Sequence, residues 1–174
     1  TSLTATAEAG IYGVDFEAAL NAQGFKHGHH PQSFEFSTLG GWIAASGAGQ
    51  QSNAYGRAGD WFAGATVATA KGLWRLPALP ASAAGPDLRA LLVGSEGAFG
   101  VITEATVRIH AKPKASDYTA YLFSDFPSGA EAIRRMVQAE LPTSTMRLSD
   151  ADETYFFQAF GKAGASPTFK DKLQ

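Results

Sequence analysis

Hydroxyl side chains and a glycine pair lie together in residues 33–42, which read SFEFSTLGGW. Thr38 is the expected N-cap of a short helix over residues 38–45, with Leu39, Trp42 and Ile43 on one face. Glycines at a helix start leave backbone N–H groups accessible, because no Cβ obstructs an approaching anion. The segment predicts a site for a diphosphate, although the same pattern is equally typical of an ordinary capped helix packed on a sheet.

A second glycine-rich segment, residues 94–100, reads GSEGAFG. It lies between a predicted helix over residues 87–93, with Pro86 at its first position, and the clearest predicted strand, residues 101–109. Three glycines in seven residues let the backbone turn sharply against a planar or phosphorylated ligand. Taken alone, a tight helix-to-strand turn is the simpler interpretation. Neither segment matches a P-loop or the motif G-x-G-x-x-G, which argues against P-loop nucleotide hydrolysis.

The remaining pattern predicts short strands and helices separated by loops. In the first part we expect a strand within residues 3–11, a helix over 16–23 capped by Asp15, a long irregular loop over 46–59, and a hairpin of strands 62–70 and 73–76. In the second part we expect a β-α-β unit, with strands over 118–123 and 145–148 and a helix over 128–141. Ser128 and Glu131 have capping-box spacing in that helix.

The composition narrows the class of protein. The chain has 174 residues, 45% hydrophobic and 17% charged, with a formal net charge of −2. This composition is that of a globular protein, and the charge balance argues against broad electrostatic capture of nucleic acid or acidic membrane. The absence of cysteine excludes disulfides, thiol nucleophiles and thiolate metal ligands. No apolar run approaches the length of a membrane span.

Other candidate sites have simpler interpretations. His27, His29 and His30 invite a metal hypothesis, but no further ligand lies near them in sequence, and a loop cluster of histidines is favoured. Asp150 and Asp152 are expected to be solvated or to cap a helix. Arg147 is expected in mid-strand, where an inward side chain needs an anionic partner and an outward one does not.

Several segments taken in order resemble one family. They are residues 28–44 (GHHPQSFEFSTLGGWIA), Asn53, Tyr55-Gly56, Asp60, residues 85–87 (GPD), 94–106 (GSEGAFGVITEAT) and 146–148 (MRL). Together they are similar to alkyldihydroxyacetonephosphate synthase and its bacterial relatives, which are FAD enzymes of the vanillyl-alcohol oxidase/p-cresol methylhydroxylase superfamily. The resemblance covers most of residues 9–150, and Trp42 after the glycine pair favours this branch over lactate- and glycolate-type flavin dehydrogenases.

The residues themselves lead us to expect no metal site, and the resemblance implies FAD as cofactor. It places these residues against the flavin and its diphosphate: Gln32, Ser33, Phe34, Glu35, Phe36, Ser37, Thr38, Gly40, Gly41, Ala45, Ser46, Gly47, Ala48, Glu96, Gly97, Ala98, Phe99, Gly100, Val101 and Ile102. It places Arg147 near the catalytic centre. In the synthases, the dihydroxyacetone phosphate part is held as a covalent adduct at flavin N5 while a fatty alcohol replaces a fatty acid. This chain departs from the synthase pattern at Ala45-Ser46 and at residues 57–60 (RAGD).

The fold implied is α+β, with a mainly antiparallel sheet and short flanking helices. Residues 1–113 are expected to form the second half of an FAD-binding domain, and residues 114–174 to begin a substrate cap domain. The expected partners are FAD, a small-molecule substrate and the N- and C-terminal parts of a longer, cytoplasmic enzyme, with a homodimer as an option and no nucleic acid. Two alternatives stay open: a flavin oxidoreductase of 2-hydroxy acids, and a non-catalytic module whose glycines are structural.

Overall fold

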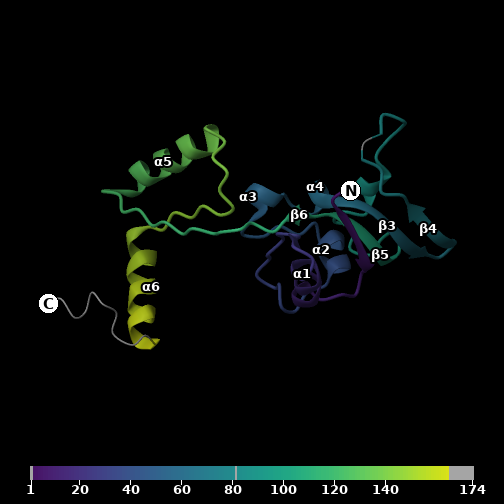
Figure 1. Cartoon of the computed structure of the whole chain (residues 1–174), viewed down its shortest axis with the longest axis horizontal. Helices are drawn as coiled ribbons and strands as arrows, with labels where there is room; N and C mark the ends of the chain where they lie inside the picture. Colours follow the sequence, from purple (N-terminus) through teal and green to yellow (C-terminus); the bar gives the residue numbers. More distant parts are fainter. Residues whose placement is uncertain (1, 81, 165–174) are drawn as a thin grey trace. The chain divides into compact units, whose positions relative to one another are not determined.

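Four antiparallel strands form the main sheet of the computed structural model, which describes residues 2–80 and 82–164 (Figure 1). The strands lie in the order β1 (Thr4–Glu8), β5 (Val101–Arg108), β3 (Phe62–Thr69) and β4 (Gly72–Leu76). A separate two-stranded ladder pairs β2 (Phe25–Lys26) with β6 (His110–Ala111). The sheet and the short helices around it confirm the predicted α+β class.

The central position of β5 follows from its pattern. Ala105 and Val107 are fully buried in the core, and Ile109 after the strand is buried too. The predicted alternation fails at its first residue, because Val101 is 68% exposed while Ile102 packs against the core. The ladder between β3 and β5 shifts register between Thr66 and Val67. Such a bulge re-aims the side chains on either side of it.

The predicted hairpin is confirmed as β3 and β4, which pair from Thr69↔Gly72 to Ala65↔Leu76. Gly72 adopts φ 120°, which a tight turn requires and other residues avoid. The sheet packs on α1 (Gly13–Asn21) and α2 (Leu39–Ala44), which lie together in Figure 1. Side chains of both helices join those of β3 and β5 in a single core.

Three predictions in the first part need correction. The first helix begins at Gly13 with Tyr12 as N-cap, so Asp15 lies in its first turn and is not the cap. The long loop contains two single-turn helices, α3 (Ser52–Tyr55) and α4 (Ala58–Trp61), and α4 buries Ala58 and Trp61. The helix after Pro86 is one 3-10 turn, η1 (Leu88–Leu91), capped by Asp87.

The chain divides into two units, which we describe separately: unit 1 is residues 1–116 with 143–145, and unit 2 is residues 117–142 with those from 146 onward. Unit 2 contains α5 (Phe126–Gln138) and α6 (Ala151–Gly164). The predicted strands over 118–123 and 145–148 are absent, so the β-α-β prediction is wrong. Asp125, not Ser128, caps α5, and it accepts the Ser128 N–H at 2.8 Å.

Candidate functional site

The two glycine-rich segments meet in one groove of unit 1, with a volume of about 330 Å³. Seven predicted site residues line it: Thr38, Gly40, Gly41, Gly97, Gly100, Val101 and Ile102. Ala9, Gly10, Ala44 and Ser95 complete the lining. Two segments more than fifty positions apart in sequence therefore form one surface.

Backbone hydrogen bonds join the two segments directly. The N–H of Gly94 donates to the Ile43 carbonyl at 3.0 Å, and the N–H of Glu96 donates to the Ala44 carbonyl at 3.0 Å. Both carbonyls belong to the last turn of α2, where helix carbonyls lack partners within the helix. Glu96 adopts φ 46°, a left-handed conformation that is uncommon outside glycine and concentrates at functional sites.

The start of α2 differs from the prediction of accessible N–H groups. Thr38 is the N-cap as predicted, and its Oγ1 accepts the Gly41 N–H at 3.3 Å. The N–H of Leu39 donates to the Ile11 carbonyl and that of Gly40 to the Ala9 carbonyl, at 3.1 and 2.8 Å. A Cβ on Gly40 would lie 2.7 Å from the Ala9 Cβ. The first glycine of the pair is therefore required by close packing, and these three donors already have protein acceptors.

Unused donors lie instead at two other glycines of the groove. Within the described residues, the N–H groups of Gly10 and Gly97 donate to no protein acceptor, and both residues are exposed. A Cβ added at either would meet nothing within 4 Å, so packing does not require a glycine there. Gly97 needs its φ of 90°, whereas Gly10 lies outside the left-handed region. At Gly10 a side chain would project into space that a ligand can use.

The groove suits the diphosphate of FAD by its chemistry. No charged side chain is found among the described residues that line it. The hydrogen-bond donors of the groove are backbone N–H groups and the hydroxyls of Thr38 and Ser95. Such groups can bind phosphate oxygens without a patch of basic side chains. The open lining, the unused N–H groups and the polar but uncharged donors all fit this cofactor.

The other predicted FAD residues lie outside the groove lining. Residues 32–36 form turns before α2, Ser37 follows them, and Phe36 is 82% exposed. Ala45, Ser46, Gly47 and Ala48 follow α2, and Glu96, Ala98 and Phe99 lie in the turns before β5. Of the residues that the sequence analysis missed, Gly10 had a usable signal, because it is a glycine near the end of the region 3–11 in which a strand was predicted.

Arg147 lies in unit 2, and the strand predicted around it is absent. Its guanidinium pairs with the Glu153 carboxylate and lies over the Phe157 ring, 5.2 Å from the centroid. Its side chain is 58% exposed. Asp150 accepts the Glu153 N–H at 2.7 Å at the start of α6, in line with the capping interpretation. The role of Arg147 stays a prediction.

The histidine cluster belongs to the core. His27 and His29 are 1% and 2% exposed, and both rings contact Trp42 and Trp61. Burial lowers the pKa of His27 to about 3 and that of His29 to about 4, with smaller effects from neighbouring histidines. Both rings are therefore neutral near pH 7. No group of three or more metal-ligating side chains occurs among the described residues.

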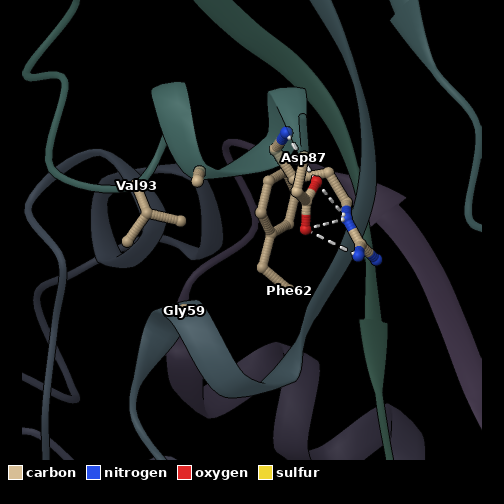
Figure 2. Close-up of a pocket in the computed structure, with 6 residues that line it drawn as sticks. Gly59, Phe62, Asp87 and Val93 are labelled. Carbon is tan, nitrogen blue, oxygen red and sulfur yellow. Dashed lines mark hydrogen bonds and ion pairs between the residues drawn. The ribbon is translucent and has the colours of Figure 1, made fainter. Parts of the chain in front are cut away.

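A smaller cleft, of about 200 Å³, lies beside η1 (Figure 2). Gly59, Phe62, Asp87, Arg89, Ala90 and Val93 line it. Its two charged groups neutralise each other, because the Arg89 guanidinium is bound to the Asp87 carboxylate (Figure 2). The cleft therefore offers a ligand no free charge.

Comparison with known proteins agrees with this geometry. The family model described as "FAD binding domain" matches residues 1–76. The alkyldihydroxyacetonephosphate synthase of Trypanosoma brucei brucei is 41% identical over 170 residues, which are 97% of this chain and 28% of that protein. Glycolate oxidase subunit GlcD of Bacillus subtilis is 29% identical over 174 residues, 99% of this chain and 37% of that protein.

The fold agrees as well. A solved alkyldihydroxyacetonephosphate synthase, crystallised in space group P1, superposes with a TM-score of 0.86 at 35% identity. That match covers 99% of this chain and 32% of the solved one, so the chain spans about a third of the length of these relatives. None of the helices within the described residues has the length and apolar composition needed to cross a membrane. Residues 1–76 therefore belong to an FAD-binding domain, and the chain is a relative, in sequence and in fold, of the alkyldihydroxyacetonephosphate synthases.

Proposed function

We propose that this chain supplies one half of the FAD site of a flavoenzyme that exchanges an acyl for an alkyl group on dihydroxyacetone phosphate. The single observation that carries the FAD site is the uncharged groove in which both glycine-rich segments meet. The substrate class is supported by the 41% identity to the trypanosomal synthase. The chain covers 28% of that protein, so the rest of the site is expected from other parts of the enzyme.

Each unit has a separate part in this proposal. Residues 1–113, nearly all of unit 1, would form the second FAD-binding subdomain, and residues from 114 would begin the substrate cap. Unit 2 exposes large apolar side chains, among them Tyr118 at 94% and Leu122 at 95%, and Gly129 is its only buried residue in the described part. A unit with so little core of its own is expected to pack against further protein.

The residues of the groove would bind and orient the cofactor. The N–H groups of Gly10 and Gly97 and the Thr38 and Ser95 hydroxyls would donate to diphosphate oxygens. The turns at residues 94–100 would hold their shape through the bonds of Gly94 and Glu96 to α2. When bound, FAD supplies the covalent chemistry of its ring system, which the side chains of this chain do not provide. Arg147 would pair with an anionic substrate group after release from Glu153.

Substitution of Gly10, a glycine that packing does not require, tests whether the groove binds FAD. In the full-length enzyme, Gly10→Ala is expected to weaken FAD binding at least tenfold, because the new methyl group occupies ligand space. Gly59→Ala is the matched control: its Cβ would meet only Val93 Cγ1, at 3.9 Å, and it lies outside the groove. Neither variant should unfold at a lower urea concentration than the wild type, because neither added Cβ meets a close neighbour. Equal FAD affinity of the two variants would contradict the assignment of the groove.

A second function is kept open by the 29% identity to the glycolate oxidase subunit over nearly the whole chain. Stopped-flow mixing of the oxidised full-length enzyme with glycolate or D-lactate distinguishes the two. An acyl-to-alkyl transferase leaves the flavin oxidised under these conditions, whereas an oxidoreductase of 2-hydroxy acids bleaches its visible band. In the transferase, Arg147→Ala should lower turnover and leave the flavin content intact.

A further inference from the structure

The guanidinium of Arg89 connects three separate segments of unit 1. Its Nε and Nη2 atoms donate to the Asp87 carboxylate at 2.8 to 3.1 Å. Its Nη1 atom donates to the carbonyls of Ala63 in β3 and Leu79 in the connector after β4, both at 3.3 Å. Two backbone carbonyls and one carboxylate thus share one planar cation, a geometry that the single ammonium of lysine does not reproduce.

The segment that Arg89 fixes leads directly into the groove. The N–H of Leu92 donates to the Arg89 carbonyl at 3.0 Å, and the N–H of Ser95 donates to the Leu92 carbonyl at 3.2 Å. Leu92 is 1% exposed and packs in the main core. Ser95 lines the groove, and Gly94 before it donates to α2. A continuous set of contacts therefore runs from the guanidinium to the groove wall.

The ion pair is shielded from solvent on its arginine side, whereas the Asp87 side chain is exposed. The Arg89 side chain is 24% exposed, and hydrogen bonds from Arg89 hold the pKa of the Asp87 carboxyl below its usual value. The Asp87 Oδ1 also accepts the Arg89 N–H at 3.0 Å, as the N-cap of η1. A 3-10 turn of four residues has little stability of its own, so its position depends on such contacts.

We propose that Arg89 is a positioning residue: by tying η1 to Ala63 and Leu79, it holds residues 94–100 against α2 and shapes the groove wall. Its effect on FAD rests on the proposed function, whereas its effect on residues 94–100 does not. Within the described residues, the side-chain hydrogen bonds of Arg89 go to Asp87, Ala63 and Leu79, and none of these lines the groove. We therefore expect Arg89 to act through the backbone of residues 92–95.

The test compares Arg89→Met, Arg89→Lys and Asp87→Asn by amide hydrogen exchange of the 174-residue chain. Arg134→Met is the matched control, because Arg134 makes a similar two-atom ion pair with Glu131 in unit 2. Arg89→Met should speed exchange at Gly94 and Glu96 at least tenfold relative to Val107 in β5. Arg89→Lys should rescue less than half of this effect, and Arg134→Met should change nothing at these amides. Asp87→Asn keeps a side-chain oxygen that can cap η1, and this variant replaces Arg89→Met in the comparison if Arg89→Met does not fold.

Two outcomes would overturn the proposal. Exchange at Gly94, Glu96 and Val107 rising by the same factor would show a purely global loss of stability. Full rescue by Arg89→Lys would show that charge alone matters. FAD titration of the full-length enzyme is the second measurement, in which Arg89→Met should raise the Kd at least fivefold. A wild-type enzyme that binds no FAD would refute the proposed function, while the exchange data would still decide the role of Arg89.

Discussion

Lowering the pH from 7 to 5 is expected to destabilise unit 1 through its buried histidine pair. The four ring nitrogens of His27 and His29 have no hydrogen-bond partner in the described structure. Burial keeps both rings neutral, with pKa values of about 3 and about 4 against an ordinary value of 6.5. The electrostatic and hydrogen-bond interactions of the pair and of the histidines beside it involve Glu17, Lys26, His30 and His110. Of these, the Glu17 carboxylate accepts the His27 backbone N–H, which leaves the imidazole unpaired.

The sign follows from which state takes up protons. Below pH 6.5 the histidines of the unfolded chain become charged while His27 and His29 in the fold stay neutral. Proton binding therefore lowers the free energy of the unfolded state and reduces the free energy of unfolding. At pH 5 this costs about 2 kcal/mol for each ring, or about 4 kcal/mol for the pair. The loss continues to about pH 4 for His29 and about pH 3 for His27. Carboxylates contribute mainly below about pH 4.5, outside the tested window.

Urea unfolding at pH 7, 6 and 5 measures this effect. His27→Phe should reduce the loss between pH 7 and 5 by about 2 kcal/mol, because one of the two buried rings no longer titrates. Trp61→Phe is the control, since it changes the packing of the same cluster without removing a titratable group. It should shift the free energy of unfolding equally at every pH. If wild type and His27→Phe lose the same stability over this range, the assignment of the buried neutral rings is wrong.

Three further substitutions test single contacts by urea unfolding at pH 7. Thr38→Ala removes the cap of α2 and should cost about 1 kcal/mol; an unchanged midpoint would show that the cap is dispensable. Gly100→Ala places a Cβ 2.4 Å from the Ala68 carbonyl oxygen and should cost at least about 1–3 kcal/mol, so a neutral result would contradict that close approach. Glu104→Gln relieves a like-charge pair with Glu8 directly across β1 and β5, both exposed, and should stabilise by roughly 0.2–1 kcal/mol at low salt. A gain that is unchanged in 1 M salt would argue against an electrostatic cause.

Local signals in the sequence were sufficient for several elements. Three features depend on neighbours within a few positions: the hairpin of β3 and β4, the Thr38 cap and the alternation of residues 105–109. The pairing of the two glycine-rich segments was implied by the family resemblance, and the structure brings them into one groove. The close approach of Gly40 to Ala9 depends on a contact across thirty residues, which no local pattern reports.

Other features depend on tertiary contacts that were not visible in the sequence. Residues 118–123 have strand-like composition, but within the described chain they find no partner strand, and a lone strand does not satisfy its backbone. Ser128 was the predicted cap of α5, whereas the structure has Asp125 as the cap. Pro127 favours the first turn of the helix, so the helix begins before Ser128. The sequence predicted that the histidine cluster lies in a loop. Contacts of His27 and His29 with Trp42 and Trp61 in the fold show that these two histidines are core residues.

The visible absorption spectrum of the full-length enzyme, purified without added cofactor, tests the central claim most directly when this chain is run beside it. The account predicts a flavin band in the full-length enzyme and little or none in the 174-residue chain, because the groove described here would be one half of the FAD site. An enzyme that shows no flavin, even after FAD is added, would contradict the account and leave the glycines with structural roles alone.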